Sequence, residues 1–265
     1  MAELYDDLFG AYVHGSIGTY EEILFSDFDA LVIIKNDVIF SPKRLAHVLK
    51  KLHKALLIMY EFDPLQHHGW FVLIEADFKY YPEDYFPHVL FKYAKSILPG
   101  KGNELVVDIP EEVELNRPIN NIANGIYIKL NKRNYPRNMY ELKSFLSQFM
   151  LLPALYVQAR DKKGVYKKYS FEAAKEDFKM HLWSIMDEVS LIRKEWDYTI
   201  SPLQQYIMTQ PNFLAKKLSK QIAPRIPIHI KRFLSQDFYS RILKLTDSMV
   251  TKNQKFTMSS YHVNS

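Results

Sequence analysis

Residues 13–34, VHGSIGTYEEILFSDFDALVII, contain two hydrophobic runs that are typical of strands, joined by a short polar segment. The second run carries two carboxylates, Asp27 and Asp29, directly before the apolar residues 30–34. Side chains two residues apart on a strand point to the same face, so we expect the two carboxylates to project together. Close like charges are costly to bury unless they are paired, and a divalent cation such as Mg²⁺ prefers oxygen ligands. The pair therefore predicts a metal site.

Gly15 and Ser16 follow the first hydrophobic run. A glycine after a strand lets backbone amides approach a phosphate group closely, and the serine adds a hydroxyl donor. Carboxylates for a metal beside a Gly-Ser turn predict a site for a nucleoside triphosphate.

These residues resemble the signature of the polymerase-beta-like nucleotidyltransferase superfamily. The segment reads His14-Gly15-Ser16, then ten residues, then Asp27-Phe28-Asp29-Ala30. The family pattern has a hydrophobic residue before the glycine, where this chain has His14. The resemblance implies that Asp27 and Asp29 hold two magnesium ions and that Gly15 and Ser16 bind the nucleotide.

The resemblance also implies a third acid on a later strand, and here the chain departs from the pattern. The run HHGWFVLIEADF has His68 near its start, whereas Glu75 and Asp77 come seven and nine residues later, about 23–30 Å along a strand. Asp63 lies in the preceding loop. The sequence leaves open whether His67 or His68 acts as ligand or base, whether the strand register differs, or whether the site is degraded.

A second resemblance lies in the segment GVYKKYSFEAAKEDF, residues 164–178. It is similar to the lysine-and-serine motif in the helical C-terminal domain of aminoglycoside nucleotidyltransferases, and this implies that Lys168 and Ser170 bind the nucleotide. A helix N-terminus beside lysines is also an anion site on physical grounds. An ordinary capped helix with solvated lysines is the alternative.

The order of predicted elements is strand, strand, helix, strand, helix, strand, followed by helices alone. This pattern predicts an α/β (α+β) fold with a short mixed sheet, residues 1–112, and an all-α helical domain, residues 113–265. The sequence predicts a short helix leading into a strand over 3–14, and strands in 26–35, 69–78 and 104–110. It predicts a helix in 41–62, a loop with prolines and a helix over 83–98, a helix begun by Asn138 as N-cap, and one helix over 170–196 with Ser170 as N-cap.

The charge is divided unevenly along the chain. Residues 1–110 carry a net charge of −6 and residues 111–265 a net charge of +11. An acidic part joined to a basic part suggests an anionic ligand, with a cation on the acidic side. The basic stretch 201–265 could instead bind a nucleic-acid backbone, although no known RNA-binding motif is present.

The composition excludes several classes of protein. The chain of 265 residues has no cysteine, so disulfides, thiolate metal sites and cysteine nucleophiles are excluded. No apolar run approaches the roughly 20 residues of a membrane span, and the start has no signal-peptide pattern. We expect a cytoplasmic protein with no membrane partner.

The sequence thus predicts a Mg²⁺-dependent nucleotidyltransferase with Asp27, Asp29 and His68 as catalytic residues. It would transfer a nucleoside monophosphate from an NTP to an acceptor hydroxyl on a small molecule, an RNA or a protein side chain. The alternative is a nucleotidyltransferase-like protein that has lost catalysis and binds nucleotide or nucleic acid. A carboxylate or imidazole within reach of the metal favours the enzyme, and an apolar residue there favours the binding protein.

Overall fold

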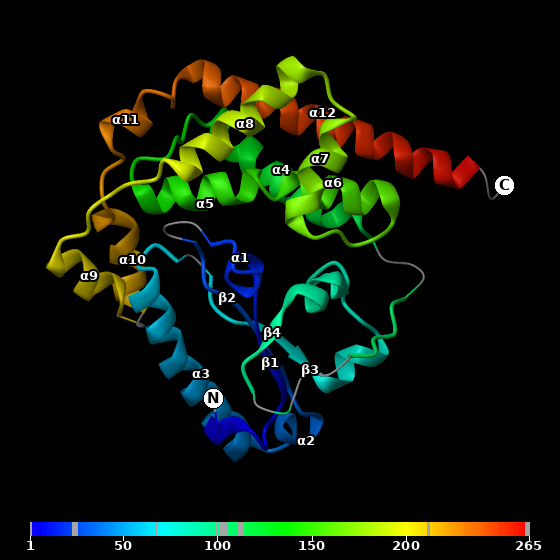
Figure 1. Ribbon diagram of the computed structural model, residues 1–265, viewed down its shortest axis with the longest axis vertical. Coiled ribbons are helices and arrows are strands. Elements are labelled where there is room, and N and C mark those ends of the chain that lie inside the picture. Colours follow the sequence, from blue (N-terminus) through cyan, green and yellow to red (C-terminus); the bar gives the residue numbers. More distant parts are fainter. Residues whose placement is uncertain are drawn as a thin grey trace. The chain divides into compact units, whose positions relative to one another are not determined.

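The computed structural model describes residues 2–22, 26–66, 68–98, 100, 105–110, 114–210 and 213–262. The chain forms two compact units (Figure 1). Unit 1 comprises Met1–Glu112 and Thr199–Pro224, and unit 2 comprises Val113–Tyr198 and Arg225–Ser265. The predicted domain division stays a prediction, because compactness alone does not test whether a segment folds by itself.

Unit 1 contains a four-stranded mixed sheet in the order β3-β2-β1-β4. Strand β1 pairs antiparallel with β2 and with β4, whereas β2 pairs parallel with β3. The strands are β1 (Leu8–His14), β2 (Asp29–Ile34), β3 (Phe71–Ile74) and β4 (Lys95–Ser96). The predicted short mixed sheet followed by helices is therefore confirmed.

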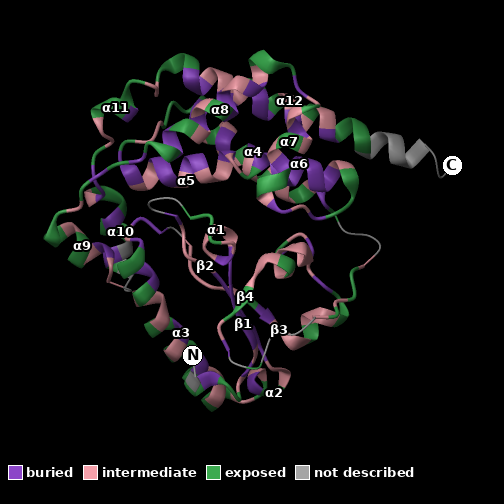
Figure 2. Cartoon of the chain, viewed as in Figure 1, coloured by how far each residue is buried: buried purple, intermediate pink, exposed green. Residues whose placement is uncertain are grey.

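The sheet is covered on both faces, which explains why β1 and β2 are almost continuously apolar. Helix α3 (Pro42–Phe62) packs Val48 and Leu52 against Val32 and its neighbours on one face. On the other face, Leu31 and Ile33 pack against Tyr81, Phe86 and the short 3-10 helix η3 (His88–Tyr93). Buried residues accordingly run along β1 and β2 (Figure 2). Two buried layers hold the ends of these strands in place.

The remaining elements of unit 1 are short. They are η1 (Ala2–Leu4), α1 (Gly15–Gly18), α2 (Asn36–Ile39), η2 (Glu75–Lys79), α9 (Pro202–Met208) and α10 (Phe213–Ile222). Helices α9 and α10 pack on each other, and the Gln204 side chain donates to the carbonyl of Ile222 at 2.6 Å.

Among the described residues of unit 2, the regular secondary structure consists of helices, apart from one isolated bridge between Asn138 and Arg225. Helix α12 packs against α4, α6 and α8, and α6 packs against α7. The helices are α4 (Asn116–Asn131), α5 (Met139–Phe149), α6 (Leu152–Asp161), α7 (Lys167–Lys175), α8 (Met180–Lys194), α11 (Ile228–Lys231) and α12 (Gln236–His262). The predicted cap of α5 is confirmed, because the Asn138 side chain accepts from the amide of Glu141 at 3.0 Å.

Three predicted elements were wrong. Residues 105–110 form no strand, although Asp108 exchanges backbone hydrogen bonds with Phe78 and Tyr81. In the loop and helix predicted over 83–98, the helix is only the short 3-10 helix η3, and strand β4 follows it. The predicted helix over 170–196 is two helices, α7 and α8, and the N-cap of α7 is Tyr166 rather than Ser170. No helix among the described residues has the length and hydropathy that a membrane crossing requires.

Candidate functional site

The end of β1 and the start of β2 meet at Gly15. Gly15 has φ +66°, a backbone conformation that side chains disfavour. A Cβ atom placed on Gly15 would lie 2.3 Å from Oδ2 of Asp29. The glycine therefore brings the backbone turn directly against the carboxylate. Ser16 follows within α1, and its carbonyl accepts hydrogen bonds from the Thr19 hydroxyl and the amide of Glu21.

The sequence predicted that the two carboxylates lie on one regular strand, and the structure shows that they do not. Strand β2 begins at Asp29, which lies opposite His14 in the antiparallel ladder, and Asp27 lies in the segment just before the strand. Both carboxylates nevertheless act on the same neighbour, because the charges of Asp29 and Asp27 each raise the pKa of His68. The site thus contains two negative charges close to one imidazole.

His68 is the third group of the cluster. Its Nε2 atom lies 3.1 Å from Oδ1 of Asp29. Burial lowers the pKa of His68, but the hydrogen bond to Asp29 and the nearby negative charges outweigh this effect, so the pKa is raised overall. His68 therefore keeps its proton to a higher pH than a free imidazole does. His67 lies outside the described residues.

The other candidate acids have structural roles elsewhere in unit 1. Asp63 is fully buried at the C-terminal end of α3, where its Oδ1 accepts from the amide of Leu65. Glu75 accepts from the amide of Asn36, and Asp77 accepts from the amide of Ile74, both beyond the far end of β3. Each of the three acids therefore accepts a backbone hydrogen bond away from Asp29, which gives it a structural role.

Sequence reasoning missed His14 as a member of the cluster. Its ring is buried and packs against Phe71 and Phe86, with ring centroids 5.5 and 5.0 Å away. Burial is the main cause that lowers the pKa of His14; the charge of Asp29 opposes the shift and His68 adds to it. The available signal was the position of a histidine at the end of a strand, immediately before the glycine.

The donor set can be compared with the needs of a magnesium ion. Among the residues that the structure describes, no group of three or more His, Asp or Glu side chains is arranged to hold a metal. Mg²⁺ nevertheless commonly binds through one or two carboxylates together with substrate phosphates. Asp27 and Asp29 fit that arrangement. They do not provide a complete cage made of protein atoms, so an ion would bind together with phosphate oxygens.

The predicted nucleotide-binding residues of unit 2 lie at the start of α7. Lys168 is exposed, with its ammonium group 6.0 Å from the centre of the Tyr169 ring. Ser170 is fully buried, and its hydroxyl donates to the carbonyl of Lys167 at 2.6 Å. A contact from Ser170 to a phosphate therefore requires the first turn of α7 to change. The nucleotide-binding roles of both residues stay predictions.

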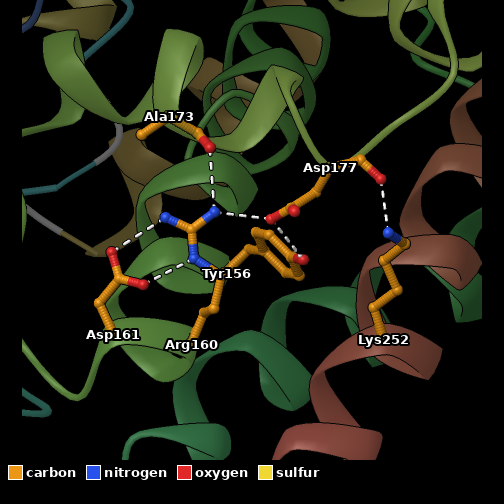
Figure 3. A network of polar contacts seen from close by, with 6 residues as sticks. All are labelled: Tyr156, Arg160, Asp161, Ala173, Asp177 and Lys252. Atoms are coloured by element: carbon orange, nitrogen blue, oxygen red, sulfur yellow. Dashed lines mark hydrogen bonds and ion pairs between the residues drawn. The ribbon is translucent and has the colours of Figure 1, made fainter.

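A polar network fixes the other end of α7 (Figure 3). Arg160 donates to Oδ2 of Asp177 at 2.6 Å and to the carbonyl of Ala173 at 3.0 Å. The Tyr156 hydroxyl donates to Asp177 at 2.9 Å, and Lys252 donates to the backbone carbonyl of Asp177 at 2.5 Å. The network joins α6, the segment after α7, and α12.

Known proteins offer limited guidance. No protein-family model matches the chain, and no curated protein matches it. Among solved structures, the chain is similar to spectinomycin adenyltransferase AAD(9) from Enterococcus faecialis, a crystal structure with ATP and spectinomycin. The identity is 12%, the match covers 94% of each chain, and the TM-score is 0.46. At these values the likeness establishes neither a shared function nor a shared substrate.

Proposed function

We propose that this protein is a Mg²⁺-dependent nucleotidyltransferase that transfers a nucleoside monophosphate from an NTP to an acceptor hydroxyl and releases pyrophosphate. The observation that carries the proposal is the contact between Gly15 and Asp29. A backbone turn suited to phosphate lies against a carboxylate suited to a cation, at the distance where a side chain would clash. Gly15 and Asp29, 14 positions apart in the sequence, therefore lie at one place.

Each residue of the cluster has a role in this proposal. Gly15 and Ser16 bind the phosphates through backbone amides, and Asp27 and Asp29 hold the ion. When bound, Mg²⁺ supplies positive charge that stabilises the developing charge on the transferred phosphoryl group. The acceptor oxygen bonds to the α-phosphorus as the bond to the pyrophosphate oxygen breaks. We assign to His68, in its neutral form, the uptake of the acceptor proton, since its ring lies against Asp29.

The nucleotide site can be tested by calorimetry. ATP, GTP, CTP and UTP are titrated with and without Mg²⁺ into the wild type, the double variant Asp27→Ala/Asp29→Ala, and the control Glu61→Ala, which changes an exposed acid of α3. We expect at least one NTP to bind in a Mg²⁺-dependent manner. The double variant should lose at least tenfold in affinity, about 1.4 kcal/mol, and the control should bind normally. The number of ions bound in the complex tests the prediction of two. Absence of NTP binding to folded wild type would overturn the proposal.

The alternative is a binding protein without catalysis, and it is favoured by the lack of a group of three metal-binding side chains among the residues that the structure describes. The imidazole 3.1 Å from Asp29 favours the enzyme, because a group able to move a proton lies at the carboxylates. Pyrophosphate release distinguishes the two. It is measured with small-molecule hydroxyl acceptors, with RNA, and with the protein itself followed by mass spectrometry. Mg²⁺-dependent NTP binding without pyrophosphate release from any acceptor class supports the binding protein.

A further inference from the structure

A glutamine that neither the motif nor the proposed chemistry includes lies directly behind the cluster. Gln66 is fully buried between the end of α3 and the start of β3. Its Oε1 accepts from the amide of Phe28 at 2.8 Å, and its Nε2 donates to the carbonyl of Phe28 at 3.0 Å and to the carbonyl of His68 at 3.1 Å. One side chain thus makes hydrogen bonds to the backbones of two segments of the site.

These hydrogen bonds replace a missing part of the sheet. The parallel ladder between β2 and β3 runs from Leu31 opposite Phe71 to Ile34 opposite Ile74. Phe28 lies beyond the end of this ladder, so no β3 backbone pairs with it. Buried backbone amides and carbonyls need partners, and the side-chain amide of Gln66 supplies both a donor and an acceptor, as another peptide group would.

Phe28 is the residue between the two carboxylates. Its ring also packs edge-on against Phe62 at the end of α3, with the centroids 5.7 Å apart. The backbone of Phe28 is hydrogen-bonded to Gln66 and its ring packs against Phe62. These contacts fix the backbone position from which the side chains of Asp27 and Asp29 extend. The third hydrogen bond of Gln66 fixes the backbone of His68 relative to the same point.

We propose that Gln66 is a positioning residue of the site, which sets the distance between the carboxylates of Asp27 and Asp29 and the imidazole of His68. Side chains that orient metal ligands or reacting groups through hydrogen bonds affect affinity and rate although they touch no substrate. The effect of Gln66 on nucleotide binding rests on the proposed function. The role of Gln66 in fixing the geometry of the cluster does not.

The test uses a matched pair of buried glutamines in the full chain. Gln66→Met keeps the length of the side chain and removes its hydrogen bonds. Gln158→Met makes the same change at a glutamine that is also buried, in α6 of unit 2. The imidazole nitrogen signals of His68 are recorded by NMR at one pH without nucleotide, and they are identified by their absence in His68→Gln. We expect these signals to move toward those of the exposed His229 in Gln66→Met and to stay unchanged in Gln158→Met.

A second measurement connects the position to function. The ratio of ATP affinities with and without Mg²⁺ should fall about tenfold or more in Gln66→Met and stay at the wild-type value in Gln158→Met. If Gln66→Met does not fold, Gln66→Asn, which keeps the amide group but shortens the side chain by one methylene and so moves it away from Phe28 and His68, takes its place. Unchanged His68 signals in a folded Gln66 variant would overturn the positioning role. Wild type without Mg²⁺-dependent ATP binding would overturn the proposed function, while the NMR result still decides the role of Gln66.

Discussion

At the scale of single residues, Gly15 is subject to two independent constraints. Its φ of +66° disfavours any side chain, and a Cβ atom would lie 2.3 Å from Oδ2 of Asp29. The first constraint costs about 1–2 kcal/mol in a residue that has a Cβ. The second can be relieved only if the Asp29 carboxylate moves, and this couples the stability of the turn to the geometry of the site.

We therefore expect Gly15→Ala to lower the free energy of unfolding by about 1–3 kcal/mol and to abolish Mg²⁺-dependent NTP binding. Urea unfolding and calorimetry measure the two effects. Gly125→Ala is the matched control, because Gly125 lies in α4 with nothing within 4 Å of an added Cβ. This control should gain about 0.5–1 kcal/mol. Equal stability of Gly15→Ala and wild type would contradict the strained geometry.

The sequence singles out those residues of the candidate site whose spacing is local or whose chemistry stands out, and their roles stay predictions. Gly15, Asp27 and Asp29 follow from a short pattern, and His68 follows from its place before a hydrophobic run. Gln66 could not be predicted, because its hydrogen bonds to Phe28 span 38 residues and a glutamine before a strand has no distinguishing signal. Side-chain contacts between segments become visible only in the fold.

At the scale of secondary structure, local sequence signals predicted where a helix begins and ends, but they did not predict where a helical pattern is interrupted. Helix α3 begins at Pro42 after Ser41 and ends before Asp63, as the prolines indicated. The break between α7 and α8 was missed, because the hydrophobic spacing continues through it. Asp177 lies in that break and is held by Arg160, Tyr156 and Lys252, which come from other helices. Tertiary hydrogen bonds there override the helical pattern.

This explanation predicts that the ion pair of Arg160 and Asp177 supports the break. Arg160→Met should lower the free energy of unfolding at pH 7 by about 1 kcal/mol. The effect is small because both side chains are partly exposed and water screens the ion pair. Arg137→Met removes an ion pair between Arg137, which lies just before the N-cap of α5, and Glu141 in the first turn of α5. Because this pair is more exposed, its loss should cost at most about 0.5 kcal/mol. Urea unfolding compares the two variants.

The difference in stability between wild type and Arg160→Met should also depend on pH. Burial alone would raise the pKa of Asp177, but the hydrogen bonds from Arg160 and Tyr156 lower it overall. A carboxyl whose pKa is depressed in the folded protein stabilises it above the unfolded pKa, about 3.9, and loses this contribution as the pH falls through the folded pKa. The difference between Arg160→Met and wild type should therefore shrink between pH ~5 and pH ~3. A difference that stays constant over this range would contradict an ionic contribution.

At the scale of the whole molecule, charge is divided unevenly along the chain, with a net charge of −6 over residues 1–110 and +11 over residues 111–265. The acidic segment contains the carboxylates proposed to hold Mg²⁺, and the basic segment contains Lys168 at the start of α7. The sequence predicted the division of charge because it depends only on composition along the chain. It could not predict that residues 199–224 belong to the same compact unit as the sheet, because that depends on contacts between distant segments.

The role predicted for Lys168 can be decided by ligand-induced stabilisation. A ligand at 100 times its dissociation constant stabilises the folded protein by about 2.7 kcal/mol, so Mg·ATP should raise the unfolding temperature of the wild type by several degrees. If Lys168 contributes charge to the triphosphate site, Lys168→Ala should show a clearly smaller shift at the same ATP concentration. Lys244→Ala, which changes an exposed lysine of α12, should show the wild-type shift. Tryptophan fluorescence follows both units at once, because Trp70 lies in unit 1 and Trp183 and Trp196 lie in unit 2. Equal shifts in wild type and Lys168→Ala would contradict a contribution of the Lys168 charge to nucleotide binding.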